Sequence, residues 1–428
     1  MIELTVRLLK ELAPAAWRIE KREEESAELF LVRKQLDTRR LKDVSRLRVT
    51  VFRDDEEGRR GFTTVDLTPG LSEEEIRRKL EETYYAASFA MNPGYEQPDP
   101  VQAAVPPADT PFMTRPLSET AGRMAAALLA GDDHPSAFLN SAEIFAVRSH
   151  IRILSSEGTD VSWSQAVVKG EFVAQCREPV DVEIYKDFEY DRPEEEALTA
   201  LVRETLSFAA DRARAQKAPA SGDYDLVLTG DSVREILDYY LNRASAYMIY
   251  PGYSSWQRGA LVQPADNGFE SLDLTLKASA PFSSEGIPMK DRVLLDMGIL
   301  KTIPGGNRFC RYLDTEPTGE YRKLACTNEG SCSLSDLKKG PCLWAVTFSD
   351  FQMDPMSGYF GGEIRLAYLI GEDGSMTPVT GGSVSASILE TQNKMLLSTD
   401  RMVTSRYEGP AGIRIRGVSV AGSKEAEA

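Results

Sequence analysis

The chain has 428 residues, of which 42% are hydrophobic and 27% charged, and these ordinary proportions exclude a disordered, collagen-like or disulfide-scaffold protein. At about 150 residues per domain, the length predicts two to three domains. Fifty Lys and Arg against 66 Asp and Glu give a formal charge of −16. That charge repels phosphate, so we expect no nucleic-acid partner.

The first residues do not resemble a secretion signal. Charged residues are scattered among the apolar ones over 1–17, and no uncharged apolar run approaches the roughly 20 residues of a membrane span. Five cysteines, an odd number without a secretory context, suit a reducing compartment and predict free thiols. We therefore expect a cytoplasmic protein with no membrane partner.

The first half begins with strand-like patterns that lead into a helix. Runs rich in Val, Phe, Leu and Thr predict strands at 27–32, 47–52 and 61–67. Ser72, followed directly by three glutamates, predicts the N-cap of an amphipathic helix. Seven prolines over 92–116 exclude a regular helix or interior strand and predict a connector.

After the connector the same patterns return. The predicted strands here are 142–147, 150–154, 159–168, 171–175 and 182–190. Pro193 and the acidic residues after it predict the start of a second helix. Strands followed by an acid-capped helix therefore occur twice, which predicts a structural duplication within the first half.

A polar linker over 215–222 predicts the main domain boundary. It is followed by a strand at 225–229, a helix at 232–246 and many short Gly-rich β-type runs. We therefore predict an α+β protein. Its N-terminal strand-and-helix domain would cover 1–215, including the Pro-rich connector at about 92–116, and its β-rich C-terminal domain would cover 222–422 with a large mixed or barrel-like sheet.

Common catalytic motifs are missing from the sequence. It contains no G-x-S-x-G elbow, no G-x-x-x-x-G-K-[ST] loop and no H-E-x-x-H helix. The four later cysteines lack the C-x-x-C spacing of a structural zinc site and are most simply small buried hydrophobes or idle thiols. They are Cys310, Cys326, Cys332 and Cys342.

The only histidines are His134 and His150. His134 stands beside two aspartates and a proline and is most simply a loop residue. His150 alternates with Arg148 and Arg152, so the three project from one strand face. That face is either a solvated basic surface or a contact for a peptide or carboxylate.

One stretch of the second half resembles a known family. Composition alone gives Glu285, Asp291 and Asp296 a structural role in a turn and the strand after it. However, 282–288 followed by 293–300 resembles the Glu-Gly turn and apolar run of the TldD/TldE (PmbA) peptidase family. Further segments agree in order: 326–328 followed by Gly340, 357–362 with 368–370 and 378–379, and 412–422. The resemblance covers 223–422, and in the first half only the layout and the turn at 155–158.

Members of this family are of two kinds. TldD chains bind zinc through H-E-x-x-x-H on a helix and a later cysteine, whereas TldE/PmbA chains lack these ligands and pair with TldD. Here the equivalent helix segment, 230–237, contains no histidine, Arg234 would repel a cation, and no cysteine follows Leu396. A catalytic zinc needs about three protein ligands. The resemblance therefore implies no metal, cofactor or catalytic residue in this chain, and zinc in a TldD-type partner.

The resemblance implies a TldE/PmbA-like subunit of a cytoplasmic peptidase assembly that acts on unfolded or small ribosomal peptides. Its partners would be a TldD-like zinc subunit and an unfolded peptide, with a homodimer as a further pairing. We place Glu285, Arg292 and Asn328 near a cleft in which an extended peptide could add to a sheet edge. Turn and strand scaffolding is the alternative role for each of the three.

Two other functions remain open. An independently active peptidase predicts cleavage without any H-E-x-x-x-H partner. A non-enzymatic regulator, as in the family's description as modulators of DNA gyrase, predicts a stable complex with gyrase and no effect on proteolysis. The sequence departs from the family at Ser283-Ser284, where acids are common, and in an insertion-like segment over 305–330, both of which affect the shape of the cleft.

Overall fold

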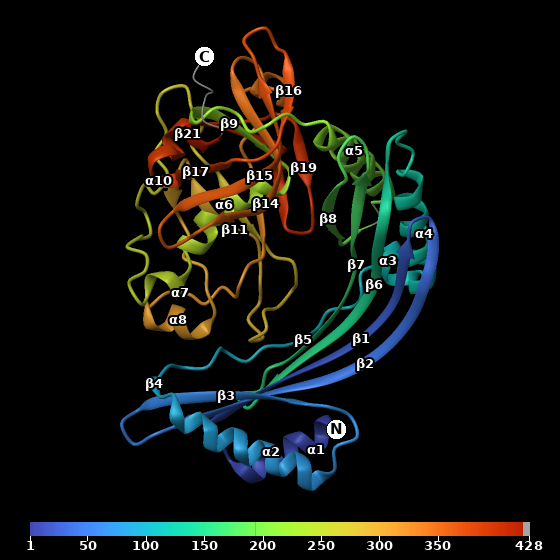
Figure 1. Cartoon of the computed structure of the whole chain (residues 1–428). Coiled ribbons are helices and arrows are strands. Elements are labelled where there is room, and N and C mark those ends of the chain that lie inside the picture. The colour runs from blue at the N-terminus through green and yellow to red at the C-terminus, as the bar shows by residue number, and fades with distance from the viewer. Residues whose placement is uncertain (193, 423–428) are drawn as a thin grey trace.

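The computed structural model describes residues 1–192 and 194–422. One part of the molecule is a single long, curved sheet with helices on its outer face, and the other part lies against the inner face of that sheet (Figure 1). The mixture of helices and strands confirms the predicted α+β class. No helix among the described residues is both long and apolar enough to cross a membrane.

The first part is built on a sheet of eight strands. Their order is β4-β3-β2-β1-β6-β7-β5, with β8 also paired to β7. The strands are β1 (Ala16–Val32), β2 (Gln35–Asp54), β3 (Arg59–Leu67), β4 (Asn92–Pro93), β5 (Gln102–Ala104), β6 (Ala137–Ser155), β7 (Asp160–Cys176) and β8 (Val182–Tyr190). β1, β2, β6 and β7 each have 17 to 20 residues, well above the usual length of about five or six.

Two predicted boundaries inside these strands are wrong. The separate strands predicted on either side of Ser149 are one strand, β6, because Ser149 occupies a buried position in an unbroken ladder. Similarly, Gly170 does not end a strand but lies within β7. A Cβ atom at Gly170 would lie 2.1 Å from the carbonyl oxygen of Glu143, so the close strand pairing there requires glycine.

Each end of this sheet carries its own pair of helices (Figure 1). α1 (Ile2–Leu12) and α2 (Glu73–Ala86) pack on β1–β3, and α4 (Leu117–Ala130) and α5 (Glu195–Ala213) pack on β6–β8. The order helix, three strands, helix therefore occurs twice, and β1 pairs with β6 antiparallel between the two copies. This repeat agrees with the predicted duplication. Pro193, predicted to open the second helix, lies outside the described residues.

The Pro-rich connector contains only three short elements, β4, β5 and the helix α3 (Pro111–Thr114). The short helical turn η1 (Ala87–Phe89) comes just before it. β5 pairs in parallel with β7 at the edge of the sheet. This position suits a proline-rich segment, because an edge strand leaves one row of backbone groups without ladder partners.

The second part begins at β9 and contains a closed barrel. One sheet has the order β14-β9-β21-β17-β15-β16, with β18 paired to β21, and β14 also pairs with β15. Five strands therefore form a ring, which is the predicted barrel-like sheet. The ring consists of β9 (Gly222–Thr229), β14 (Cys342–Met353), β15 (Tyr359–Ile370), β17 (Ser383–Ser387) and β21 (Gly412–Ala421). The other two strands of the sheet, β16 (Met376–Val379) and β18 (Met395–Leu397), pair with β15 and β21.

A second sheet of this part has the order β12-β11-β10-β13-β20-β19. Its strands are β10 (Leu274–Lys277), β11 (Arg292–Asp296), β12 (Ile299–Leu300), β13 (Lys323–Cys326), β19 (Arg401–Val403) and β20 (Tyr407–Pro410). The remaining helices are α6 (Asp231–Arg243), α7 (Ala246–Ile249), α8 (Asn307–Tyr312), α9 (Leu334–Leu337), α10 (Ile388–Thr391) and the turn η2 (Gln392–Lys394).

The helix α6 forms the centre of the second part. Its apolar residues Val233, Ile236, Leu237, Tyr239 and Tyr240 are at most 1% exposed and belong to one core cluster with residues of both sheets. Burying this face removes a large apolar area from water and fixes the helix between the barrel and the second sheet. Consequently only its charged face remains accessible.

Candidate functional site

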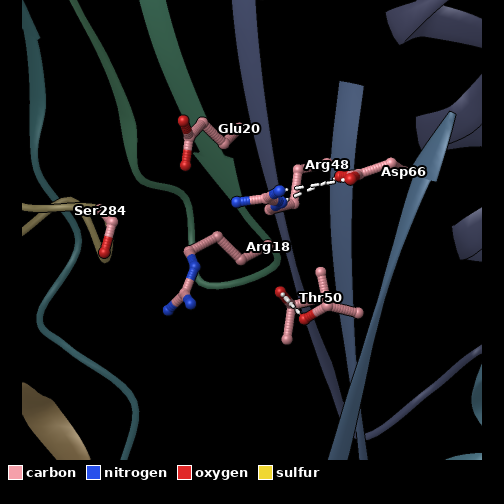
Figure 2. A pocket seen from close by; sticks show the side chains of 7 residues that line it. Arg18, Glu20, Arg48, Thr50, Asp66 and Ser284 are labelled. Atoms are coloured by element: carbon pink, nitrogen blue, oxygen red, sulfur yellow. Dashed lines mark hydrogen bonds and ion pairs between the residues drawn. The ribbon is translucent and has the colours of Figure 1, made fainter. Parts of the chain in front are cut away.

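A polar pocket of about 510 Å³ lies on the inner face of the long sheet, where the two parts meet (Figure 2). Its floor consists of two rows of cross-strand neighbours, Arg18–Thr50–Thr64 and Glu20–Arg48–Asp66. Ser284, from the loop that precedes β11, faces this floor from the second part. We take this pocket as the candidate site.

Strand alternation places the polar residues there. Trp17, Ile19, Val49 and Val51 point outward into the core beneath α1 and α2. The residues between them must therefore point to the inner face. This pocket was not predicted from the sequence, because alternating charged residues are also typical of a solvated strand face. The available signal was the same alternation in three strands that pair with one another.

The two rows of the floor differ electrostatically. Arg48 donates to both carboxylate oxygens of Asp66, at 2.9 and 3.2 Å. The hydrogen bonds from Arg48 hold the pKa of Asp66 below its usual range. In the other row, the hydroxyls of Thr50 and Thr64 share one hydrogen bond of 2.9 Å. Arg18 is the one cation of that row.

Glu285 adjoins the pocket and joins three segments of the chain. One carboxylate oxygen lies 3.4 Å from a guanidinium nitrogen of Arg18, and the other accepts the backbone N–H of Asn307 at 2.6 Å. The turn that holds it requires Gly286, which has φ of 78°. A Cβ atom there would lie 2.9 Å from the methyl of Thr159. The conformation and the close contact both favour glycine.

The other two predicted peptide contacts lie away from the pocket. Arg292, on β11, donates to both oxygens of Glu316 at 2.7 and 3.1 Å. The side-chain amide of Asn328 instead accepts the N–H of Asp273 at 2.8 Å and donates to the carbonyl of Ser271 at 2.7 Å. The structure therefore brings only Glu285 to the pocket, and a role in peptide binding stays a prediction for all three.

The remaining residues singled out in the sequence have local partners. Arg148, His150 and Arg152 share the outer face of the long sheet. Arg148 donates to one carbonyl of α3 and to the carbonyl of Arg115 just after it, His150 contacts Ser164, and Arg152 forms two hydrogen bonds with Asp160. His134 Nδ1 accepts a backbone N–H at 3.1 Å. Asp291 pairs with Lys277, and Asp296 pairs with Lys301 at 3.0 Å.

The five cysteines are free thiols in the structure, and Cys176, Cys310, Cys326 and Cys342 are buried. Burial raises the pKa of Cys326 to about 12, so its thiol stays protonated at neutral pH. A protonated thiol is a poor nucleophile and a poor metal ligand. This environment gives Cys326 a packing role.

The accessible face of α6 carries charge. Arg234 pairs with Asp238 at 2.5 Å and lies 3.7 Å from Glu235, and Lys186 of β8 pairs with Asp231. Burial, opposed by Arg234 and reinforced by Asp231 and Asp238, raises the pKa of Glu235 to about 7. Each acidic residue of this face therefore has a cation close to it.

The residues of α6 do not fit a zinc ion. When residues 234–239 are compared with the motif H-E-x-x-x-H, Glu235 matches the glutamate of the motif. Arg234 and Tyr239 stand at the two histidine positions. A guanidinium provides no lone pair for a metal, and Tyr239 is buried in the core. Among residues 1–192 and 194–422, no three His, Cys, Asp or Glu side chains gather in a way that could hold a metal.

Residues 221–422 match the PmbA/TldA metallopeptidase C-terminal domain. The second part of the chain, residues 221–422, is therefore a domain of the TldD/TldE (PmbA) family. A protein described as a metalloprotease TldD homolog, from Buchnera aphidicola, is 28% identical over 150 residues. That match covers 32% of this chain and 31% of the relative, so it spans about a third of the relative's length.

Solved structures share the fold of this chain along nearly its whole length. TldE from Thermococcus kodakarensis superposes with a TM-score of 0.79 at 14% identity, covering 98% of this chain and all of that one. A protein from Bacteroides thetaiotaomicron described as a modulator of DNA gyrase gives 0.80 at 14% identity, covering 99% of both chains. A protein of the same description from Thermotoga maritima gives 0.77 at 16% identity, with 98% and 100% covered.

Proposed function

We propose that this chain is a metal-free, TldE/PmbA-like subunit of a cytoplasmic TldD/TldE-type peptidase assembly that acts on unfolded or small ribosomal peptides. The observation that carries the proposal is the composition of α6. An arginine and a buried tyrosine occupy the histidine positions of the family's zinc motif, and the arginine is held in an ion pair with Asp238. Chemistry would then come from zinc in a TldD-type partner, and this chain would bind and position the substrate.

Cleavage of an unstructured peptide tests this division of labour. We would measure it with the purified chain alone, with a TldD-type partner from the same source alone, and with both together. The expected result is no cleavage by the chain alone and faster cleavage by the pair than by the partner alone. A chelator should abolish the activity of the pair, because zinc supplies the activated water.

A variant of this chain tests whether α6 takes part in the chemistry. Glu235 is the one residue of the zinc motif that the chain retains, so Glu235→Gln should leave cleavage by the pair unchanged if α6 takes no part in the chemistry. Loss of activity in that variant, or cleavage by the isolated chain, would contradict the proposal and support an independently active peptidase. A stable complex with DNA gyrase and no effect on cleavage would instead support the regulatory function.

A further inference from the structure

We propose that the polar pocket on the inner face of the long sheet binds the carboxylate of a peptide, and that Arg18 is the residue that binds it. This inference rests on the proposed role in peptide handling, and it adds the chemical group that the chain recognises. It comes from the pocket's geometry: the largely buried guanidinium of Arg18, three hydroxyl groups, the carboxylate of Glu20 and the Arg48–Asp66 pair surround a space of about 510 Å³.

Arg18 has unused hydrogen-bonding capacity. Its side chain is 20% exposed and makes one long contact, 3.4 Å, with Glu285. A guanidinium has five N–H donors in a planar fork that matches a carboxylate. Within the described chain, Glu285 is the only acceptor found for these donors. Figure 2 shows the Arg18 side chain extending into the space between the strands and Ser284. A ligand carboxylate in that space would receive the remaining donors.

The hydroxyl groups in the same row complete an anion site. Thr50 and Thr64 share one hydrogen bond, so one of their two hydroxyl hydrogens remains available to a ligand. Ser284 is exposed and faces the same space. These donors and Arg18 surround the place where the carboxylate would lie.

The charge of the pocket favours a peptide carboxylate over a phosphate. Arg18 and Arg48 stand against Glu20, Asp66 and the adjoining Glu285, so the surroundings carry a net formal charge of −1. A doubly charged phosphate would be repelled by these acids. A single carboxylate meets less repulsion. In addition Glu20, whose nearest cation is 3.9 Å away, can accept an N–H group of the same peptide.

Titration calorimetry on the isolated chain tests the proposal. The probe is an unstructured ten-residue peptide of Gly, Ser and Ala, used as the free acid, as the C-terminal amide, and as an amide with one internal Asp. We expect the free acid to bind about tenfold or more tightly than the amide, as charge-assisted hydrogen bonds imply. Recovery of the affinity by the Asp-containing amide would identify side-chain carboxylates as ligands too, and no recovery would restrict the site to the C-terminus.

Variants assign the preference to the pocket. Arg18→Gln should remove the difference between acid and amide, and Arg18→Lys should restore part of it. Arg78→Gln, on the far side of the sheet on α2 and 69% exposed, is the matched control and should bind like the parent. If Arg18→Gln does not fold, Ser284→Asp serves instead, because this exposed loop position would place a repelling carboxylate in the pocket and weaken the free acid about tenfold.

Equal binding of acid and amide by the parent chain, or an unchanged preference in Arg18→Gln or Ser284→Asp, would overturn the carboxylate site. Because the titration uses no partner, it is independent of the cleavage assay. Loss of the preference together with partner-dependent cleavage would reject only the pocket, whereas an intact preference without any such cleavage would reject only the subunit proposal.

Discussion

At the scale of single residues, Glu285 shows how far the sequence could identify the site. The Glu-Gly turn was visible in the sequence, and with it the position of Glu285. Its partners were not visible, because Arg18 lies 267 residues away and Asn307 lies 22 residues away along the chain. Local patterns carry no information about such contacts, and for the same reason the pocket beside Glu285 could not be predicted.

Glu235 leads to a pH-dependent prediction. Its ordinary pKa is 4.5 and its folded pKa is about 7, so between these pH values the folded chain holds more protons than the unfolded chain. Stability therefore falls as the pH rises from about 4.5 to about 7. Glu235→Gln removes this loss. Because the side chain is 33% exposed and solvent screens it, we expect the variant to be more stable than the parent by about 1 kcal/mol at pH 8.

Urea denaturation at pH 5 and pH 8 checks this expectation. At pH 5 the parent carboxyl is largely protonated, so the advantage of Glu235→Gln should nearly vanish. Glu372→Gln, at an exposed position, is the control and should show no pH-dependent difference. An equal advantage for Glu235→Gln at both pH values would contradict the assignment of the titration to Glu235.

At the scale of elements, helix and strand identity followed the local signals, whereas lengths and some helices depended on tertiary contacts. β8 has the bounds that its alternation predicted. The helix α1 was not predicted, since residues 1–17 were considered only as a possible secretion signal; Ile2, Thr5 and Val6 in it are β-branched and weaken helix propensity. This helix is stabilised by burying Leu8 and Leu9 against the sheet.

The start of α2 was predicted from the sequence, and the contribution of its N-cap to stability can be measured. Ser72 Oγ accepts the N–H of Glu75 at 3.3 Å, and the Glu75 carboxylate accepts the N–H of Ser72 at 2.8 Å, forming a capping box. Ser72→Ala should destabilise the chain by about 1 kcal/mol in urea denaturation, because a backbone N–H loses its acceptor. Ser72→Thr keeps the hydroxyl and should cost less than half of that. Equal losses in both variants would argue against the cap.

At the scale of the whole molecule, an apolar cluster fastens the two parts together. Phe282, in the loop that carries Ser284 and Glu285, packs on Trp163 with 6.0 Å between ring centroids, and Ile151, Ile153 and Val161 surround the pair. The pocket lies beside this contact. Its shape therefore depends on the docking of the second part on the long sheet.

Removing the ring of Phe282 should weaken the packing of the second part on the long sheet. Phe282→Ala is expected to destabilise the molecule by about 3 kcal/mol, from lost burial and the cavity that remains. Trp163 is the natural reporter: its fluorescence should shift to the red before the rest of the chain unfolds in denaturant. Phe89→Ala, at a side chain 72% exposed, is the control and should change stability by less than about 0.5 kcal/mol. A single unshifted transition in Phe282→Ala would contradict this role.

The closed barrel also constrains the order in which a growing chain can fold. β9 is the first strand of the second part, yet it pairs with both β14 and β21, so Leu226 meets Leu343 and Ile415. During synthesis, β9 and the apolar face of α6 leave the ribosome long before either neighbour exists. That half of the protein acquires its native core only once β21 has emerged, and until then the apolar face of α6 is exposed to other chains and to chaperones.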